Sequence, residues 1–273
     1  MDYTRTILCF DRGLRAEHFK PNVIRHQQSL VFVHGICHGS WVWWNFMDYF
    51  ASQGFSCYGL NLRGHFLSSG HAELGMATTI DYVADVATCC AAIPGPVILV
   101  GHSMGGIVCQ KAAEQSRVHK LILLDSAPCR HVTEHYLSID PRRMKTSRKA
   151  FQMLPDGTVC MDRNPDIVRE LFFEKNKVSD EALMQTVSLL GRESAKSAAD
   201  HGFLDVDPSL LSCPVYVLGR TGLGNSANPD MYGALADYLK AKERCLRDDI
   251  SHNMMCEQDW QDHAALVERW CLA

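Results

Sequence analysis

The chain has 273 residues, of which 47% are hydrophobic and 21% are charged, and its formal net charge is −4. This length and composition are typical of one large globular α/β domain, with or without an inserted subdomain. The slightly acidic charge argues against the basic surface that binds nucleic acid or anionic membranes, so we expect no nucleic-acid partner.

Twelve cysteines are present, and none of them forms a C-x-x-C pair. No run approaches the roughly 18 apolar residues that a membrane-spanning helix needs. Residues 1–5 lack the apolar stretch of a signal peptide. We therefore predict a cytoplasmic protein with reduced thiols, without a membrane span or a disulfide framework.

Strand and helix patterns alternate along much of the chain. Short apolar runs predict buried strands at residues 29–33, 55–60, 97–100, 119–124 and 215–218. Apolar residues at helical spacing predict helices at 41–52, 79–92 and 107–114. Strands that alternate with helices form a mostly parallel sheet with both faces covered, so we predict an α/β fold.

One long segment interrupts this alternation. Residues 127–208 are rich in charge and in helix-forming residues, contain no convincing strand, and separate two predicted core strands. We therefore predict that residues 1–126 and 209–273 form the α/β core and that residues 127–208 form an inserted helical cap.

The strongest motif is Gly101-His102-Ser103-Met104-Gly105, which follows the strand at 97–100 and precedes a helix. A sharp turn between strand and helix holds a serine in a strained conformation with its hydroxyl exposed. Small residues at 101 and 105 let the strand and helix approach closely, and the helix N-terminus offers N–H groups to a developing oxyanion. This context predicts Ser103 as a nucleophile.

A second run, His34-Gly35-Ile36-Cys37-His38-Gly39-Ser40-Trp41, follows the strand at 29–33 and is a candidate for a second N–H donor. With Arg63-Gly64-His65 and the late Ser251-His252-Asn253-Met254-Met255, these motifs resemble the α/β-hydrolase superfamily from about Ser29 to the end of the chain. The His-Gly-x-Cys-His-Gly-x-Trp pattern is most similar to the branch of plant methylesterases and hydroxynitrile lyases. Residues 63–68 look more like bacterial esterases and lipases.

The resemblance implies a role for several residues. The backbone N–H groups of Ile36 and Met104 would hold the oxyanion, and His252 would be the general base, since this fold orders its triad as serine, acid, histidine. His34 would be structural. Three further residues are candidates to line the substrate pocket, with packing roles left open: His38, Trp41 and His102. We expect no cofactor and no metal, because His34 and His38 lack carboxylate or cysteine partners at ligand spacing.

The acid of the triad is the member that the sequence leaves open. The family usually places it just after the strand at 215–218, where this chain reads Gly219-Arg220-Thr221-Gly222-Leu223-Gly224-Asn225 without a carboxylate. Asp125 is the first choice, because lactone hydrolases and dehalogenases of this fold carry their acid at the end of the preceding core strand. Asp230, a neutral Asn225 and the absence of a third member stay open as alternatives.

These features predict a serine hydrolase that cleaves a carboxylic ester, lactone or thioester of an apolar small molecule through an acyl-enzyme on Ser103. A non-hydrolytic enzyme, such as a lyase or a cofactor-free dioxygenase that uses a His252–Asp125 base, is one alternative. A catalytically silent binding protein is another, which the altered acid loop would permit. The fold alone does not decide among them, and the sequence predicts neither the substrate nor the oligomeric state.

Overall fold

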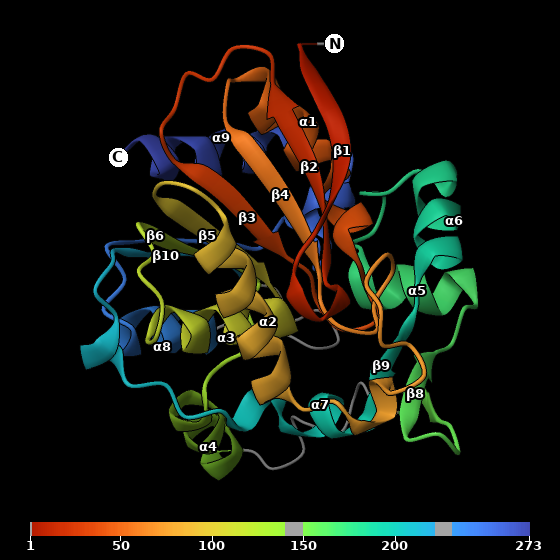
Figure 1. Ribbon diagram of the computed structural model, residues 1–273. Helices are drawn as coiled ribbons and strands as arrows, with labels where there is room; N and C mark the ends of the chain where they lie inside the picture. The colour runs from red at the N-terminus through yellow and green to blue at the C-terminus, as the bar shows by residue number, and fades with distance from the viewer. Residues whose placement is uncertain (1, 140–149, 222–230) are drawn as a thin grey trace.

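The computed structural model describes residues 2–139, 150–221 and 231–273 (Figure 1). Within these residues, eight strands form one sheet in the order β1-β2-β4-β3-β5-β6-β10-β11. The strands are β1 (Tyr3–Cys9), β2 (Arg15–Pro21), β3 (Ser29–Val33), β4 (Ser56–Asn61), β5 (Val97–His102), β6 (Lys120–Leu124), β10 (Val215–Arg220) and β11 (Glu243–Arg247). Neighbours from β4 to β11 pair in parallel, and β2 pairs antiparallel with β1 and β4. The predicted mostly parallel sheet is therefore confirmed.

Three strands of this sheet were not predicted from the sequence. β1 and β2 form an antiparallel hairpin at one edge, and β11 forms the other edge. Five of the seven residues of β1 are exposed, so the strand lacks the apolar run that marks the central strands. Edge strands of this kind leave a weaker hydrophobic signal than strands covered on both faces.

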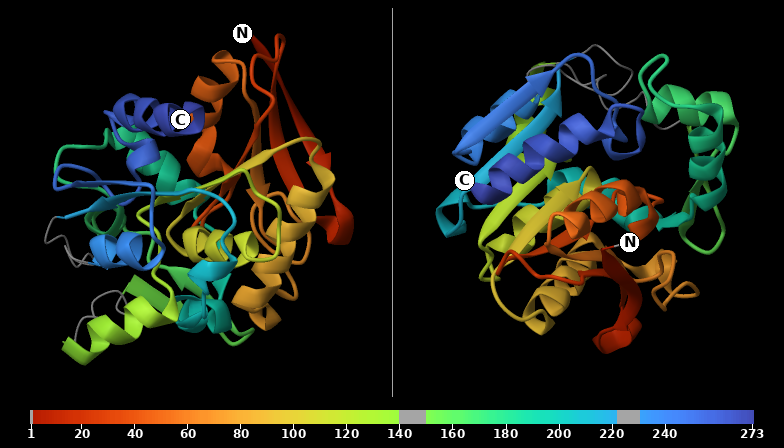
Figure 2. Two further views of the ribbon diagram at one scale, coloured as in Figure 1. Left: turned by 90° about the vertical axis from the view of Figure 1, so that its left-hand side faces the viewer. Right: turned by 90° about the horizontal axis from the view of Figure 1, so that it is seen from above.

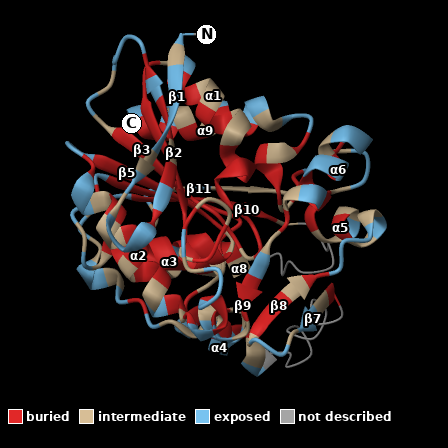
Figure 3. Ribbon diagram, turned by 45° about the vertical axis from the view of Figure 1, so that its right-hand side comes forward, coloured by how far each residue is buried: buried red, intermediate tan, exposed pale blue. Residues whose placement is uncertain are grey.

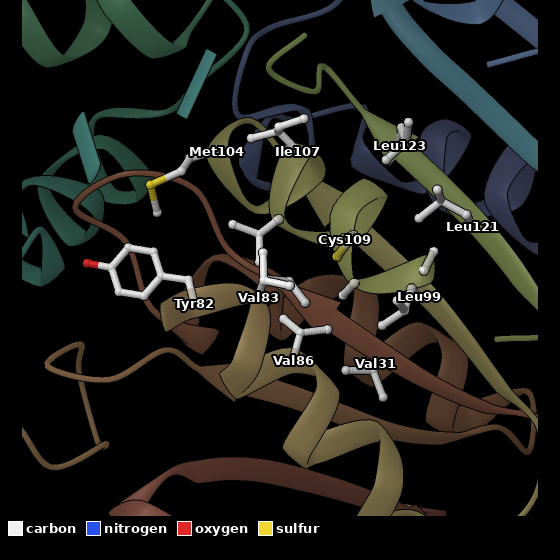
Figure 4. Packing of buried hydrophobic residues seen from close by; sticks show 14 of the residues in the cluster. Val31, Tyr82, Val83, Val86, Leu99, Met104, Ile107, Cys109, Leu121 and Leu123 are labelled. Carbon is white, nitrogen blue, oxygen red and sulfur yellow. The ribbon is translucent and has the colours of Figure 1, made fainter. Parts of the chain in front are cut away.

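Helices cover both faces of the sheet (Figure 2). On one face lie α1 (Trp44–Ser52) and α9 (Trp260–Leu272), and on the other lie α2 (Thr79–Ala92), α3 (Met104–Ala113) and α8 (Met231–Tyr238). Because successive side chains of a strand point to opposite faces, Phe32 packs on the first side and Val31 on the second. Figure 3 shows that the central strands are buried, and Figure 4 shows side chains of α2 and α3 packed against Val31, Leu99 and Leu121.

The helices of the fold are short compared with a bilayer. Among the described elements, α2 has 14 residues and α9 has 13. No helix in this part of the chain combines the length and the apolar character that crossing a membrane requires.

The segment at 127–208 contains strands as well as helices. Its described helices are α4 (Arg130–Ile139), α5 (Pro165–Phe172), α6 (Asp180–Leu189) and α7 (Ala195–Asp200). A three-stranded antiparallel sheet accompanies them, formed by β7 (Phe151–Met153), β8 (Thr158–Met161) and β9 (Arg192–Ser194). The expectation that this segment contains no strand is therefore wrong, and its role as a cap stays a prediction. Strands of three or four residues are too short to show periodicity, but the Pro155-Asp156-Gly157 turn between β7 and β8 is a recognisable hairpin signal.

A buried polar cluster fastens this segment to the core. Glu193 of β9 accepts hydrogen bonds from His65 Nε2 at 3.0 Å and from the Tyr82 hydroxyl, and all three residues are buried. Burial disfavours the charged imidazole, but the Glu193 carboxylate outweighs this effect and raises the pKa of His65. Burial likewise opposes the charge of Glu193, yet His65 lowers the pKa of this carboxyl. Both shifts favour the charged form of this buried pair, which joins β9 to the loop after β4.

Candidate active site

Ser103 lies between β5 and α3 in a strained backbone conformation. Its φ of 52° and ψ of −124° place a residue with a Cβ in a region that costs on the order of 1–3 kcal/mol. Three backbone hydrogen bonds hold it there: Ser103 N–H donates to Leu124 O, and Ser103 O accepts from the N–H groups of Gly106 and Ala127. The structure thus has the sharp strand-to-helix turn that the G-x-S-x-G motif indicated.

Glycines around Ser103 allow this turn to pack. A Cβ built on Gly105 would lie 2.3 Å from the backbone oxygen of His34, and one on Gly106 would lie 2.2 Å from Ser126 Oγ. A Cβ on Gly35 would lie 2.9 Å from Ser103 Cβ and 3.4 Å from Ser103 Oγ. The loop after β3 therefore passes directly beside the Ser103 side chain.

The backbone N–H groups of Ile36 and Met104 are both available for a ligand. Neither donates a hydrogen bond to any of the residues that the structure describes. Met104 is the first residue of α3, where helix N–H groups have no partner within the helix. Two unpaired N–H groups beside a serine are the arrangement that stabilises the oxyanion of a tetrahedral intermediate.

Asp125 and His252 are brought together from distant parts of the chain. Asp125 follows β6, and its Oδ2 contacts His252 Nδ1. The same oxygen accepts a hydrogen bond from Arg220 Nε at 2.8 Å, and Oδ1 accepts from the Arg220 backbone N–H at 3.3 Å. The carboxylate is fully buried, whereas 16% of the His252 side chain is exposed. Of the acid candidates, Asp125 is thus the one seen beside the imidazole.

The surroundings of Asp125 keep it ionised. Burial opposes the charge, but the Arg220 guanidinium and His252 more than offset this and hold the pKa of Asp125 well below its usual range. Tyr232 of α8 also hydrogen-bonds to Asp125, and burial raises the pKa of this tyrosine, so it stays a neutral donor. Arg220 and Tyr232 were missed from the sequence, although an arginine where the family usually carries an acid was a signal of a changed charge arrangement.

His252 lies beside the Ser103 turn. The neighbouring His102 donates from Nε2 to the backbone oxygen of His252 at 2.9 Å, and the centroids of the two rings are 4.6 Å apart. Phe172, the last residue of α5, stacks on the His252 ring with a centroid distance of 5.9 Å. Within the described residues, Ser103 Oγ forms no hydrogen bond, and contacts between serine and base are commonly loose before substrate binds.

The three candidate pocket residues, His38, Trp41 and His102, are almost fully buried. His38 contacts the Ile36 backbone oxygen through Nδ1, and its Nε2 accepts from Asn253 Nδ2 at 3.0 Å. Burial lowers the pKa of His38 to about 4 and also lowers the pKa of His102, so both rings are neutral at pH 7. His38 thus connects the loop that carries Ile36 to the loop that carries His252, and a pocket-lining role for these residues stays a prediction.

The remaining candidates for the acid, Asp230 and Asn225, fall outside the described residues. His34 donates from Nδ1 to the Gly35 backbone oxygen at 2.9 Å and accepts from Leu62 N–H at 3.2 Å, so it braces the loop. In the described ranges, no group of three or more histidine, cysteine, aspartate or glutamate side chains is arranged to hold a metal ion.

Comparisons with known proteins agree with this fold. Residues 28–159 match the family model described as alpha/beta hydrolase fold. The chain is 25% identical over 150 residues to Methylesterase 3 of Arabidopsis thaliana, a match that covers 54% of this chain and only 56% of that relative.

Two solved structures are similar over most of the chain. One is the methylesterase MES16 from Arabidopsis, with a TM-score of 0.70, 18% identity, and coverage of 89% of this chain and 98% of that chain. The other is polyneuridine aldehyde esterase, with a TM-score of 0.71, 18% identity, and coverage of 89% and 99%. At this identity the structural likeness shows the fold. Together, these matches and the strand order show that the chain has the α/β-hydrolase fold, and plant methylesterases are among the proteins that it resembles in sequence.

Proposed function

We propose that this protein is a serine hydrolase that cleaves carboxylic esters. The observation that carries the proposal is the Asp125–His252 pair beside the strained Ser103 turn. The names of the relatives, methylesterase and esterase, support the same class of reaction. Small methyl esters are therefore the first substrates to test, followed by lactones and thioesters.

Each residue has a defined part in the proposed reaction. His252 takes the proton of Ser103 as the hydroxyl attacks the ester carbonyl, and the N–H groups of Ile36 and Met104 stabilise the oxyanion. The Asp125 carboxylate holds the imidazole in the tautomer with a proton on Nδ1 and stabilises the imidazolium. His252 then protonates the leaving alcohol, and water releases the acid from the acyl-enzyme by the same steps.

We also propose that residues 127–208 act as a cap that limits access to Ser103. Two contacts support this role: Phe172 stacks on the His252 ring, and its backbone oxygen accepts from Asn253 N–H at 2.9 Å. An inserted segment that contacts the base is well placed to exclude water and select substrates.

A comparison of three variants tests the proposed hydrolase. Wild-type protein should hydrolyse p-nitrophenyl acetate and react with a fluorophosphonate probe, and Ser103→Ala and His252→Ala should both abolish turnover. Ser188→Ala, which removes an exposed hydroxyl on α6, should retain it. Turnover of another substrate that survives in Ser103→Ala but not in His252→Ala would instead indicate base chemistry of the lyase or dioxygenase kind. If the wild-type protein shows no turnover and no labelling, it is a binding protein.

A further inference from the structure

We propose that Arg220 is a positioning residue that sets both the orientation and the basicity of the Asp125–His252 pair. The inference rests on the proposed hydrolase function and adds to it a residue that the triad does not contain. Arg220 is the last residue of β10, the strand after which the family usually carries the acid of its triad. In this chain the acid, Asp125, follows the neighbouring strand β6 instead.

The contacts of Arg220 fix the carboxylate at two points. Its side-chain Nε donates to Asp125 Oδ2 at 2.8 Å, and its backbone N–H donates to Oδ1 at 3.3 Å. The register pairs Leu218 of β10 with Leu124 of β6, so the ends of the two strands lie side by side. A rigid strand end therefore holds the carboxylate, which leaves Oδ2 directed at His252 Nδ1.

The guanidinium also acts on the imidazole by its charge. Arg220 Nη2 lies 3.5 Å from His252 Nδ1, a distance at which a positive charge in a shielded site disfavours a second positive charge on the ring. Asp125 alone would favour the imidazolium strongly, and a base that is already protonated cannot accept the Ser103 proton. The Arg220 guanidinium opposes this second positive charge.

The other groups that face His252 are uncharged at neutral pH. His102 contacts its backbone and ring, Phe172 stacks on it, and His38 lies behind His102 at a ring-centroid distance of 6.1 Å. Tyr232, which hydrogen-bonds to Asp125, is neutral as well. Asp125 and Arg220 are thus the charged side chains that contact His252 among the described residues, and Glu257, which accepts from the Ser251 backbone N–H at 2.9 Å, contacts His263.

The pH dependence of kcat/KM for an ester tests the proposal. Arg220→Met removes the charge, so the midpoint of the acidic limb should move to higher pH by about one unit. Arg220→Lys keeps a charge but not the planar fork, so its midpoint should stay near that of the wild type while kcat falls. Arg247→Met is the matched control, because Arg247 pairs with Arg220 in register on β11 but bonds to Asp249; it should leave the midpoint unchanged.

Two outcomes would overturn the proposal: an unmoved midpoint in Arg220→Met, or an equal shift in Arg220→Lys. If Arg220→Met does not fold, Arg220→Gln replaces it, because glutamine removes the charge but keeps a hydrogen-bond donor. The midpoint of Arg220→Gln is then compared with that of Arg220→Lys. The titration of the His252 ring, followed by NMR in the same variants, gives the answer without any substrate. If Arg220→Met shifts the NMR midpoint of His252 but the protein has no Ser103-dependent turnover, the proposed role of Arg220 stands and only the proposed hydrolase function is rejected.

Discussion

Replacing Asp125 with asparagine tests the catalytic and structural roles of this carboxylate together. The change breaks the ion pair between Asp125 and Arg220, whose side chain is only 7% exposed. Breaking a buried ion pair by replacing one partner costs about 3–5 kcal/mol of the free energy of unfolding, which for a domain of this size lowers Tm by roughly 6–20 °C. Ester turnover should fall by about 10³–10⁴-fold, because the amide no longer holds the imidazole tautomer.

A double variant separates the two effects. In Asp125→Asn combined with Arg220→Met, both members of this ion pair are replaced, so most of the lost stability should return. Turnover should stay low, because the carboxylate is still missing. Thermal unfolding followed by circular dichroism and steady-state hydrolysis of p-nitrophenyl acetate measure the two quantities on the same samples.

The neighbouring ion pair supplies the control for this experiment. Asp249→Asn breaks the half-exposed pair with Arg247, which should cost less than about 1 kcal/mol and leave turnover intact. If Asp125→Asn retains turnover within about tenfold of the wild type, another group is the acid, since a triad acid is worth far more. If the double variant is as unstable as the single one, the broken ion pair with Arg220 is not the cause of the loss.

Three further changes test other parts of the structure. Glu193→Gln should lower the free energy of unfolding by about 3–5 kcal/mol at neutral pH. Urea unfolding should show that this difference between variant and wild type becomes smaller as pH rises through the raised pKa of His65, and also as pH falls through the lowered pKa of Glu193. Gly105→Ala places a Cβ 2.3 Å from a backbone oxygen and should cost about 3 kcal/mol; a wild-type Tm would contradict this. Asn253→Ala frees His38 Nε2 and should lower kcat by about ten- to a hundredfold through a looser oxyanion loop, and unchanged steady-state kinetics would argue against such a brace.

Features that depend on neighbours in the sequence were predictable. The central strands are short apolar runs because both of their faces are buried, and the Ser103 turn could be located because its glycines satisfy a local steric requirement. Asp125 could be proposed because the position after β10 carries no acid, and because some enzymes that the chain resembles carry their acid at the end of the preceding core strand, which is β6 here.

Features that depend on contacts across the fold were not predictable from one sequence. The Arg220–Asp125 ion pair joins residues 95 positions apart, and nothing in the local sequence of Arg220 shows which carboxylate it meets. β9 joins a sheet whose other strands precede it by about thirty residues, and its three residues have no periodicity of their own. The residues around β7, β8 and β9 are rich in helix formers, so the composition of this segment predicted helices and no strands.

The attachment of β9 through Glu193 has a consequence for attempts to alter substrate selectivity by grafting. Exchanging residues 127–208 for the corresponding segment of another hydrolase would remove the carboxylate that neutralises His65 while leaving the imidazole in the recipient core. A functional chimera must therefore either keep a glutamate at that point of the graft or replace His65 with an apolar side chain at the same time. The loop after β4 and strand β9 should therefore be exchanged together.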